Sequence, residues 1–208
     1  MFCVRDNAAA LLFDAQLLKR NDRISRAYAL AYSACEESGK LSILVGAATQ
    51  VSLGIPIDWK VVRRRFRSHD SKASQFTGLA NAIPIILNAA KAGHKTVDSE
   101  EIITKATAGV LVGPALFSKR NASLYCDFDG HSFTSPDDQI TESMTNRMIQ
   151  WAENHVIAAN AILRGSQDDA ITRFRSASRE QYDSVMLRAA EAVELLSNAS
   201  TLDPERAK

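Results

Sequence analysis

Apolar residues recur every three or four positions along most of the chain, the spacing that places them on one face of an α-helix. We expect a first helix that Asp6 or Asn7 caps and that stops at residues 19–22. A second helix, capped by Asp22, runs to about Gln50. The sequence Ser-Leu-Gly-Ile-Pro that follows is a strong helix stop. The chain is therefore predicted to open with two consecutive helices.

The helical spacing continues through the middle of the chain. A third helix starts near Asp58, carries the most charged stretch of the protein over residues 60–69, and continues with a kink to Pro84. A fourth helix covers about residues 98–118. Helices are thus predicted both before and after the charged stretch, which indicates a bundle of helices.

Residues 119–135 interrupt the helical pattern and are polar and aromatic. Asp129-Gly130 lies between the segments 124–128 and 131–133, in which residue types alternate. Asp-Gly in this setting is typical of a short hairpin with a type I′ turn. We expect these residues to form a protruding loop or hairpin.

Two further helices follow the loop. Ser135 supplies an N-cap, with a proline at the first helical position and two acidic residues behind it, and the helix runs to Gly165. The last helix carries an apolar stripe over residues 171–196, and the tail at about residues 198–208 is frayed. Both helices have the narrow apolar seam of helices packed side by side. The prediction is an all-α bundle of five to six helices that forms a single domain over residues 1–208.

Composition is that of an ordinary soluble globular protein, with 46% hydrophobic residues, 24% charged residues and a formal net charge of +1. This balance excludes a nucleic-acid-binding surface along the whole chain and leaves room for a local basic patch. Cys3, Cys35 and Cys126 are scattered, which indicates reduced thiols and neither a zinc site nor a disulfide framework. We find no membrane span and no signal peptide, and expect a cytoplasmic protein.

Familiar enzyme signatures are absent. The chain has no Gly-rich phosphate loop, no Gly-x-Ser-x-Gly and no His-Glu-x-x-His, and no Glu has a His three residues later, as a di-iron bundle requires. We expect no metal and no cofactor. His155 lies on the core stripe and is interpreted as a packing residue, and His94 and His131 as loop residues.

One dense basic cluster stands out, and it contains Arg63, Arg64, Arg65, Arg67, His69 and Lys72. Such a run is either a solvated helix face or a phosphate-binding surface in which His69 transfers protons near neutral pH. On a regular helix Arg64 and His69 point about 140° apart. They act on one phosphate only if the helix breaks between them or if each comes from a different subunit. Arg65 and His69 share a face without such a break.

The second candidate segment is Glu36-Glu37-Ser38-Gly39-Lys40, in the middle of the second helix. Glycine inside a helix costs about 1 kcal/mol, so Gly39 predicts a close approach by another backbone or side chain. Glu37 and Lys40 either pair on the surface, or Glu37 is partly buried and orients an arginine or the histidine of the next helix.

Three stretches of the sequence resemble the AbiV family of abortive-infection proteins, in the HEPN superfamily. The first leads into Glu36-Glu37-Ser38-Gly39-Lys40 and is similar to the family's "A…LA..A.EE.GK" opening. The second, residues 66–72, is similar to its "F..H..K" segment. The third, residues 124–128 with Ser135-Pro136, is similar to its "LYVD…SP" loop.

The resemblance implies a HEPN-like bundle in phage defence, with RNA as the target. Many HEPN proteins are metal-independent ribonucleases that use Arg-x4–6-His, often across a homodimer, and this motif falls on Arg64 (or Arg63) and His69. Arg65 and Arg67, with Arg63, are then expected to bind RNA. Supporting roles fall on Glu37, Lys40 and Lys72.

The chain departs from the usual HEPN pattern in two respects. Arg65 is basic where a polar or acidic residue is common, and the motif lies in the first half of the chain. The alternative hypothesis is a non-catalytic protein that blocks translation or binds a phage product through the basic helix and the loop at Tyr125. Expected partners are RNA or the translation machinery, a phage protein or a neutralising antitoxin, and no membrane.

Overall fold

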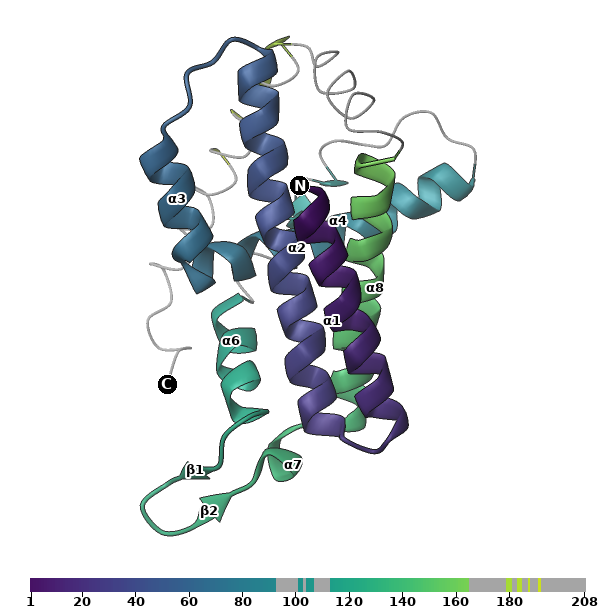
Figure 1. Cartoon of the computed structure of the whole chain (residues 1–208), viewed down its shortest axis with the longest axis vertical. Coiled ribbons are helices and arrows are strands. Elements are labelled where there is room, and N and C mark those ends of the chain that lie inside the picture. The colour runs from purple at the N-terminus through teal and green to yellow at the C-terminus, as the bar shows by residue number, and fades with distance from the viewer. Residues whose placement is uncertain are drawn as a thin grey trace.

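The protein is a bundle of helices with one short hairpin at its end (Figure 1). The computed structural model describes residues 1–92, 101–102, 104–106 and 113–164, with isolated positions between 179 and 191. The predicted all-α fold is confirmed. The predicted last helix, residues 171–196, falls almost wholly outside the described residues, as does the tail.

The helices are α1 (Phe2–Arg20), α2 (Ile24–Ser52), α3 (Trp59–Arg67), α4 (His69–Lys91), α6 (Gly113–Ala122), α7 (Pro136–Gln139) and α8 (Glu142–Ile162). The two strands are β1 (Asp127–Phe128) and β2 (Phe133–Thr134). The long helices α1, α2 and α8 pack against one another along the bundle (Figure 1). Helix α4 packs on α2 and α8, and α6 packs on α4 and α2. Helix α2 therefore lies at the centre and contacts every other helix of the bundle named here.

Helix α1 begins at Phe2, so the predicted cap at Asp6 or Asn7 is wrong. Phe2 and Val4 pack beside a small buried cluster that contains Leu41. Burial of these apolar side chains continues the helix past the capping residues, because tertiary packing outweighs local preference.

The predicted cap of α2 is also wrong. Asp22 lies in the turn with a φ of 56°, and the N-cap is Arg23, which makes no side-chain cap hydrogen bond. The start of α2 is held by tertiary contacts instead, since the Ser25 hydroxyl donates to the Asp137 carboxylate at 2.6 Å and the Thr145 hydroxyl donates to the Ile24 carbonyl at 3.2 Å. The end of α2 lies two residues beyond the predicted one.

The centre of the core is aromatic. Tyr32 and Phe76 are fully buried and meet edge to face, with ring centroids 5.2 Å apart. The hydroxyls of Tyr28 and Tyr32 are buried and have no hydrogen-bond partner among the described residues. Burial raises the pKa of Tyr28 to about 12 and raises the pKa of Tyr32 as well, so both keep their proton.

His155 is a packing residue, as the apolar stripe predicts. It is 2% exposed, and its two ring nitrogens contact the carbonyl oxygens of Trp151 at 2.7 Å and Phe76 at 2.9 Å. Burial lowers the pKa of His155, against the opposite effect of the two carbonyls. This imidazole is therefore held within the core by two backbone carbonyls.

The hairpin forms, but with a longer turn than the predicted type I′. Phe128 pairs with Phe133, which leaves residues 129–132 as the loop, and only Gly130 among them has a positive φ. The carboxylate of Asp129 accepts hydrogen bonds from the backbone N–H groups of His131 and Ser132. These bonds stabilise an Asx-type turn in place of the two-residue turn.

The helix that follows the hairpin is divided in two. Ser135 is the N-cap as predicted and forms a capping box with Asp138, but α7 ends after one turn. Helix α8 has its own cap, Thr141, whose hydroxyl accepts from the Met144 N–H. Ile140, between them, is 3% exposed, and its burial accounts for the extended backbone at the junction.

Candidate functional site

The predicted third helix breaks at Ser68 into α3 and α4. Asp58 caps α3 as predicted, with its carboxylate accepting from the N–H groups of Lys60 and Val61. Ser68 has an extended backbone, with a ψ of 120°, and α4 then continues through Pro84. Arg64 and His69 therefore stand on two different helices, which is the break that their joint action on one phosphate requires.

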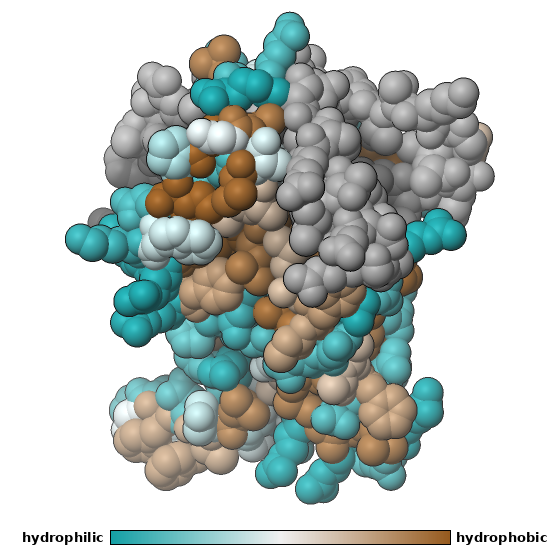
Figure 2. Space-filling model, turned by 45° about the horizontal axis from the view of Figure 1, so that its top comes forward, coloured by the Kyte–Doolittle hydropathy of each residue, from teal (hydrophilic) through white to brown (hydrophobic). Residues whose placement is uncertain are grey.

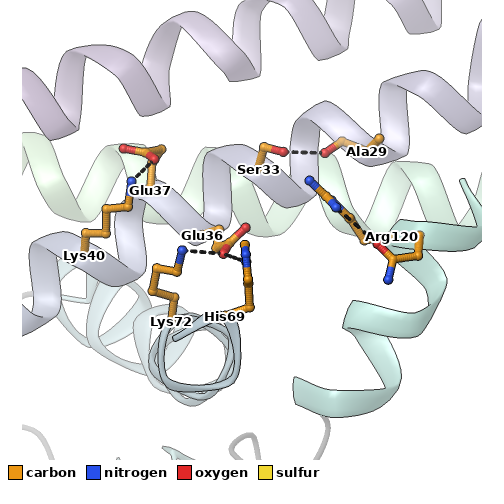
Figure 3. A network of polar contacts seen from close by, with 9 residues as sticks. Ala29, Ser33, Glu36, Glu37, Lys40, His69, Lys72 and Arg120 are labelled. Atoms are coloured by element: carbon orange, nitrogen blue, oxygen red, sulfur yellow. Dashed lines mark hydrogen bonds and ion pairs between the residues drawn. The ribbon is translucent and has the colours of Figure 1, made fainter. Parts of the chain in front are cut away.

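His69 is the first residue of α4, and its side chain is 51% exposed. Its Nδ1 lies 2.5 Å from Oε1 of Glu36, so Nδ1 donates to that carboxylate (Figure 3). The ring stacks on Phe117 of α6, with centroids 5.4 Å apart and an interplanar angle of 29°. Two elements, α2 and α6, thus fix an imidazole whose Nε2 edge faces away from the carboxylate.

Glu36 is the buried centre of this cluster. It is 7% exposed, and the same oxygen that binds His69 lies 2.8 Å from Nζ of Lys72, which is also 7% exposed. His69 and Lys72 are three residues apart at the start of α4 and so lie on one face of it. The sequence singled out both residues, and the structure brings them together on one carboxylate of α2 (Figure 3). We call these three residues the Glu36 cluster.

At Gly39, α2 packs against the backbone of α4. A Cβ placed on Gly39 would lie 2.6 Å from the carbonyl oxygen of Lys72, a backbone atom that has no rotamer with which to move away. The predicted close approach at this glycine is thereby confirmed. The absence of a side chain lets α4 lie low enough on α2 for Lys72 and His69 to reach Glu36.

We expect Gly39→Ala to destabilise the protein, although alanine is the better helix former by about 1 kcal/mol. Forcing α4 away from α2 costs about 1–3 kcal/mol, as overpacking does elsewhere. Gly46→Ala is the matched control, because it lies in the same helix and a Cβ there meets no atom within 4 Å. Urea unfolding measures both variants. A Gly39→Ala protein as stable as Gly46→Ala would contradict the close packing.

Glu37 does not orient His69. It forms an ion pair with Lys40, one turn along the same helix, and both side chains are about one-fifth exposed (Figure 3). A helical turn of about 100° per residue directs neighbouring side chains to different faces, so Glu36 reaches α4 and Glu37 does not. Of the two interpretations of Glu37 and Lys40, the local pair is the one that forms.

The arginines of α3 form the basic face beside this cluster. Arg63, Arg64 and Arg67 are exposed and Arg65 is partly buried. Within the described ranges, no carboxylate forms an ion pair with any of the four. The exposed guanidinium groups of Arg63, Arg64 and Arg67 are accessible to an external anion.

Arg120, on α6, adds a further positive charge that the sequence reasoning missed. It lies one turn after Phe117, the residue that stacks on His69. One guanidinium nitrogen donates to the Asn121 side chain at 3.1 Å, and Nε is buried without a partner in the described part of the chain (Figure 3). The sequence predicted a loop from residue 119, whereas α6 extends to Ala122. Arg120 was therefore not considered as part of a helix beside His69.

The arrangement around His69 suits proton transfer. A carboxylate on Nδ1 fixes the tautomer in which Nε2 carries the lone pair, which is the form that accepts a proton. Among the described residues, no three His, Cys, Asp or Glu side chains lie close enough to hold a metal ion. In the same residues, no helix is long and apolar enough to cross a membrane.

A family comparison decides what kind of bundle this is. The family described as HEPN_AbiV, AbiV, matches residues 2–157, three-quarters of the chain. The chain belongs to the AbiV family. It is therefore a HEPN-type member of an abortive-infection family, and the matched region of this AbiV protein includes α3, α4, α6 and most of α8. No curated protein and no solved structure matches the chain.

Proposed function

We propose that this AbiV protein is a metal-independent RNA endonuclease that acts in abortive infection. The observation that carries the proposal is the half-exposed His69 held by the buried Glu36, at the break between α4 and α3, a helix whose arginines form no ion pair with a carboxylate among the described residues. An oriented imidazole next to phosphate-binding charges is what the transfer of a proton in RNA cleavage requires.

In the proposed reaction, Nε2 of His69 accepts the proton of a ribose 2′-hydroxyl. The 2′-oxygen then attacks the adjacent phosphorus, the bond from phosphorus to the 5′-oxygen breaks, and that oxygen leaves with a proton from solvent. The products are a 2′,3′-cyclic phosphate and a 5′-hydroxyl. Arg64 stabilises the extra negative charge of the transition state. Glu36 acts as a positioning residue.

The remaining α3 arginines bind the RNA backbone in this account. Arg63, Arg65 and Arg67 attract phosphates regardless of base sequence. RNA affinity is therefore expected to fall as the salt concentration rises. Lys72 is not an RNA ligand here, because its ammonium group is buried against Glu36. Its role is to support the carboxylate that orients His69.

We propose a homodimer as the working form, as the HEPN resemblance implies, in which Arg64 of one chain approaches His69 of the other. The break at Ser68 opens the alternative in which both residues act within one chain. Two basic helices repel each other, and salt screens this repulsion, so dimerisation is expected to strengthen in about 0.5 M salt. Light scattering at micromolar concentration measures it. A monomer that cleaves RNA would contradict the shared site and favour a site within one chain, with Arg64 or Arg65.

One observation favours a second candidate, a non-catalytic protein that binds a phage product or the translation machinery. The hairpin projects from the bundle, and Phe128 and Phe133 on it are 53% and 78% exposed, with ring centroids 4.7 Å apart. Figure 2 shows this apolar surface at the lower left, where the hairpin lies. Exposed apolar clusters of this kind mark interaction sites.

Phage protection and RNA cleavage by two variants separate these candidates. If the protein is a nuclease, His69→Ala loses both cleavage and protection. If it acts only by binding, His69→Ala still protects, and a Phe128→Ser, Phe133→Ser variant loses protection. Circular dichroism confirms that each variant is folded. Protection by a folded His69→Ala protein would overturn the nuclease proposal.

A further inference from the structure

We propose that a pocket between α2, α6 and α8 binds one base of the RNA, a few nucleotides from the phosphate at His69. The inference rests on the proposed function and extends it to a second contact with the substrate. It assigns roles to Tyr28, Arg147 and Trp151, which the proton-transfer site does not use.

The pocket has a volume of about 290 Å³. Among the residues that line it, Leu116 comes from α6, Tyr28 from α2, and Met148 and Trp151 from α8. This volume lies at the small end of ligand pockets, so the pocket suits a single flat ring system rather than a large cofactor. Aromatic and methionine side chains are favourable surfaces for stacking such a ring.

Tyr28, which lines the pocket, has the buried polar group that the proposal uses. It is 1% exposed, and its hydroxyl has no hydrogen-bond partner among the described residues. A buried hydroxyl without a partner costs free energy, and buried polar groups in native proteins are nearly always paired. Because its pKa is raised to about 12, this hydroxyl keeps its proton and is a donor. In the proposal, the side chains that cover this hydroxyl move aside as the base enters, and a carbonyl or ring-nitrogen acceptor of the nucleobase completes the hydrogen bond.

Arg147 gives the pocket its charge. It lines the pocket from an exposed position on α8, and in the part of the chain that is described no carboxylate pairs with it. A nucleotide combines a flat ring, which fits the pocket, with a negative charge, which fits the arginine beside it. The guanidinium of Arg147 binds the phosphate while the base enters between Tyr28 and Trp151.

The pocket is close to the proposed cleavage site. Leu116 lines the pocket, and the next residue, Phe117, stacks on His69. Tyr28 and Glu36 are eight residues apart on α2, which is about 12 Å along the helix axis. A stacked strand advances roughly 3.4 Å per nucleotide, so about three or four nucleotides cover this distance. A strand of that length is therefore long enough to span the two places.

Tryptophan fluorescence tests the inference without any cleavage. In a Trp59→Phe background, Trp151 is the only tryptophan and reports on the pocket. The probe is a 2′-O-methyl RNA decamer of mixed sequence, which lacks the nucleophilic hydroxyl. The four nucleoside 5′-monophosphates form the second arm. We expect the decamer to quench Trp151 and Tyr28→Phe to weaken its binding by about 5- to 10-fold, the loss typical of one hydrogen bond.

Tyr32→Phe is the matched control, since it removes a second buried hydroxyl that lacks a partner but does not line the pocket. It should leave decamer affinity unchanged, and both variants should melt no lower than the wild type. Equal affinities of Tyr28→Phe and Tyr32→Phe for the decamer would overturn the base pocket and leave the cleavage proposal intact. Mononucleotides that bind as tightly as the decamer would overturn RNA as the occupant. Failure of cleavage alone would overturn only the nuclease reaction.

Discussion

Replacing His69 by alanine is expected to reduce RNA cleavage by about 10²–10⁴-fold, the range for loss of a general acid or base. The change should leave the fold intact. The ring is half exposed, and Glu36 keeps its ion pair with Lys72 when the imidazole is gone. We therefore expect the free energy of unfolding to change by no more than about 1 kcal/mol. Initial cleavage rates and urea unfolding measure the two effects.

His131→Ala is the control for this variant, because His131 is an exposed histidine in the hairpin loop. It should cleave RNA at the wild-type rate. Equal activity of the two alanine variants would show that the imidazole at position 69 is not part of the reaction. A large loss of stability in His69→Ala would instead show that the ring has a structural role.

Replacing Glu36 by glutamine is expected to cost about 3 kcal/mol of stability, because it leaves the buried ammonium of Lys72 without a negative partner. Cleavage should fall through kcat with little change in KM, since the imidazole is no longer held in one orientation while RNA binding by α3 persists. Glu36→Asp keeps the charge and should retain more activity. Urea unfolding and steady-state kinetics check these outcomes.

The neighbouring residue provides the control for this second prediction. Glu37→Gln removes a partly exposed pair with Lys40 and should cost no more than about 1 kcal/mol, with no effect on cleavage. The double variant Glu36→Gln, Lys72→Met removes both buried charges and should recover stability without recovering kcat. If Glu36→Gln and Glu37→Gln behave alike, Glu36 does not position His69.

Some parts of the site follow from the sequence because they depend on local chemistry. A glycine in mid-helix lowers helix stability, and at Gly39 the close Lys72 carbonyl accounts for it. The basic cluster around His69 is visible as composition alone. The helical spacing of apolar residues likewise predicts α2 and α8, whose apolar faces are buried against each other.

Other parts depend on packing that the sequence does not show. Glu36 and Glu37 are identical in type, and only the position of α4 selects Glu36. The break at Ser68 is not marked by a neighbouring proline or glycine in the sequence. Arg120 belongs to the site through the packing of α6 on α4, a contact between residues about fifty positions apart. All three features depend on tertiary packing, which the spacing of apolar residues along the sequence does not reveal.

The most direct test of the nuclease account is incubation of the purified protein with total cellular RNA in excess EDTA, followed by analysis of the product ends. The account predicts that RNA is cut in the absence of metal ions, that the ends are 2′,3′-cyclic phosphates and 5′-hydroxyls, and that a 2′-deoxy version of a cleaved oligonucleotide stays intact. Intact RNA in EDTA, or cleavage that leaves 5′-phosphates, would contradict it.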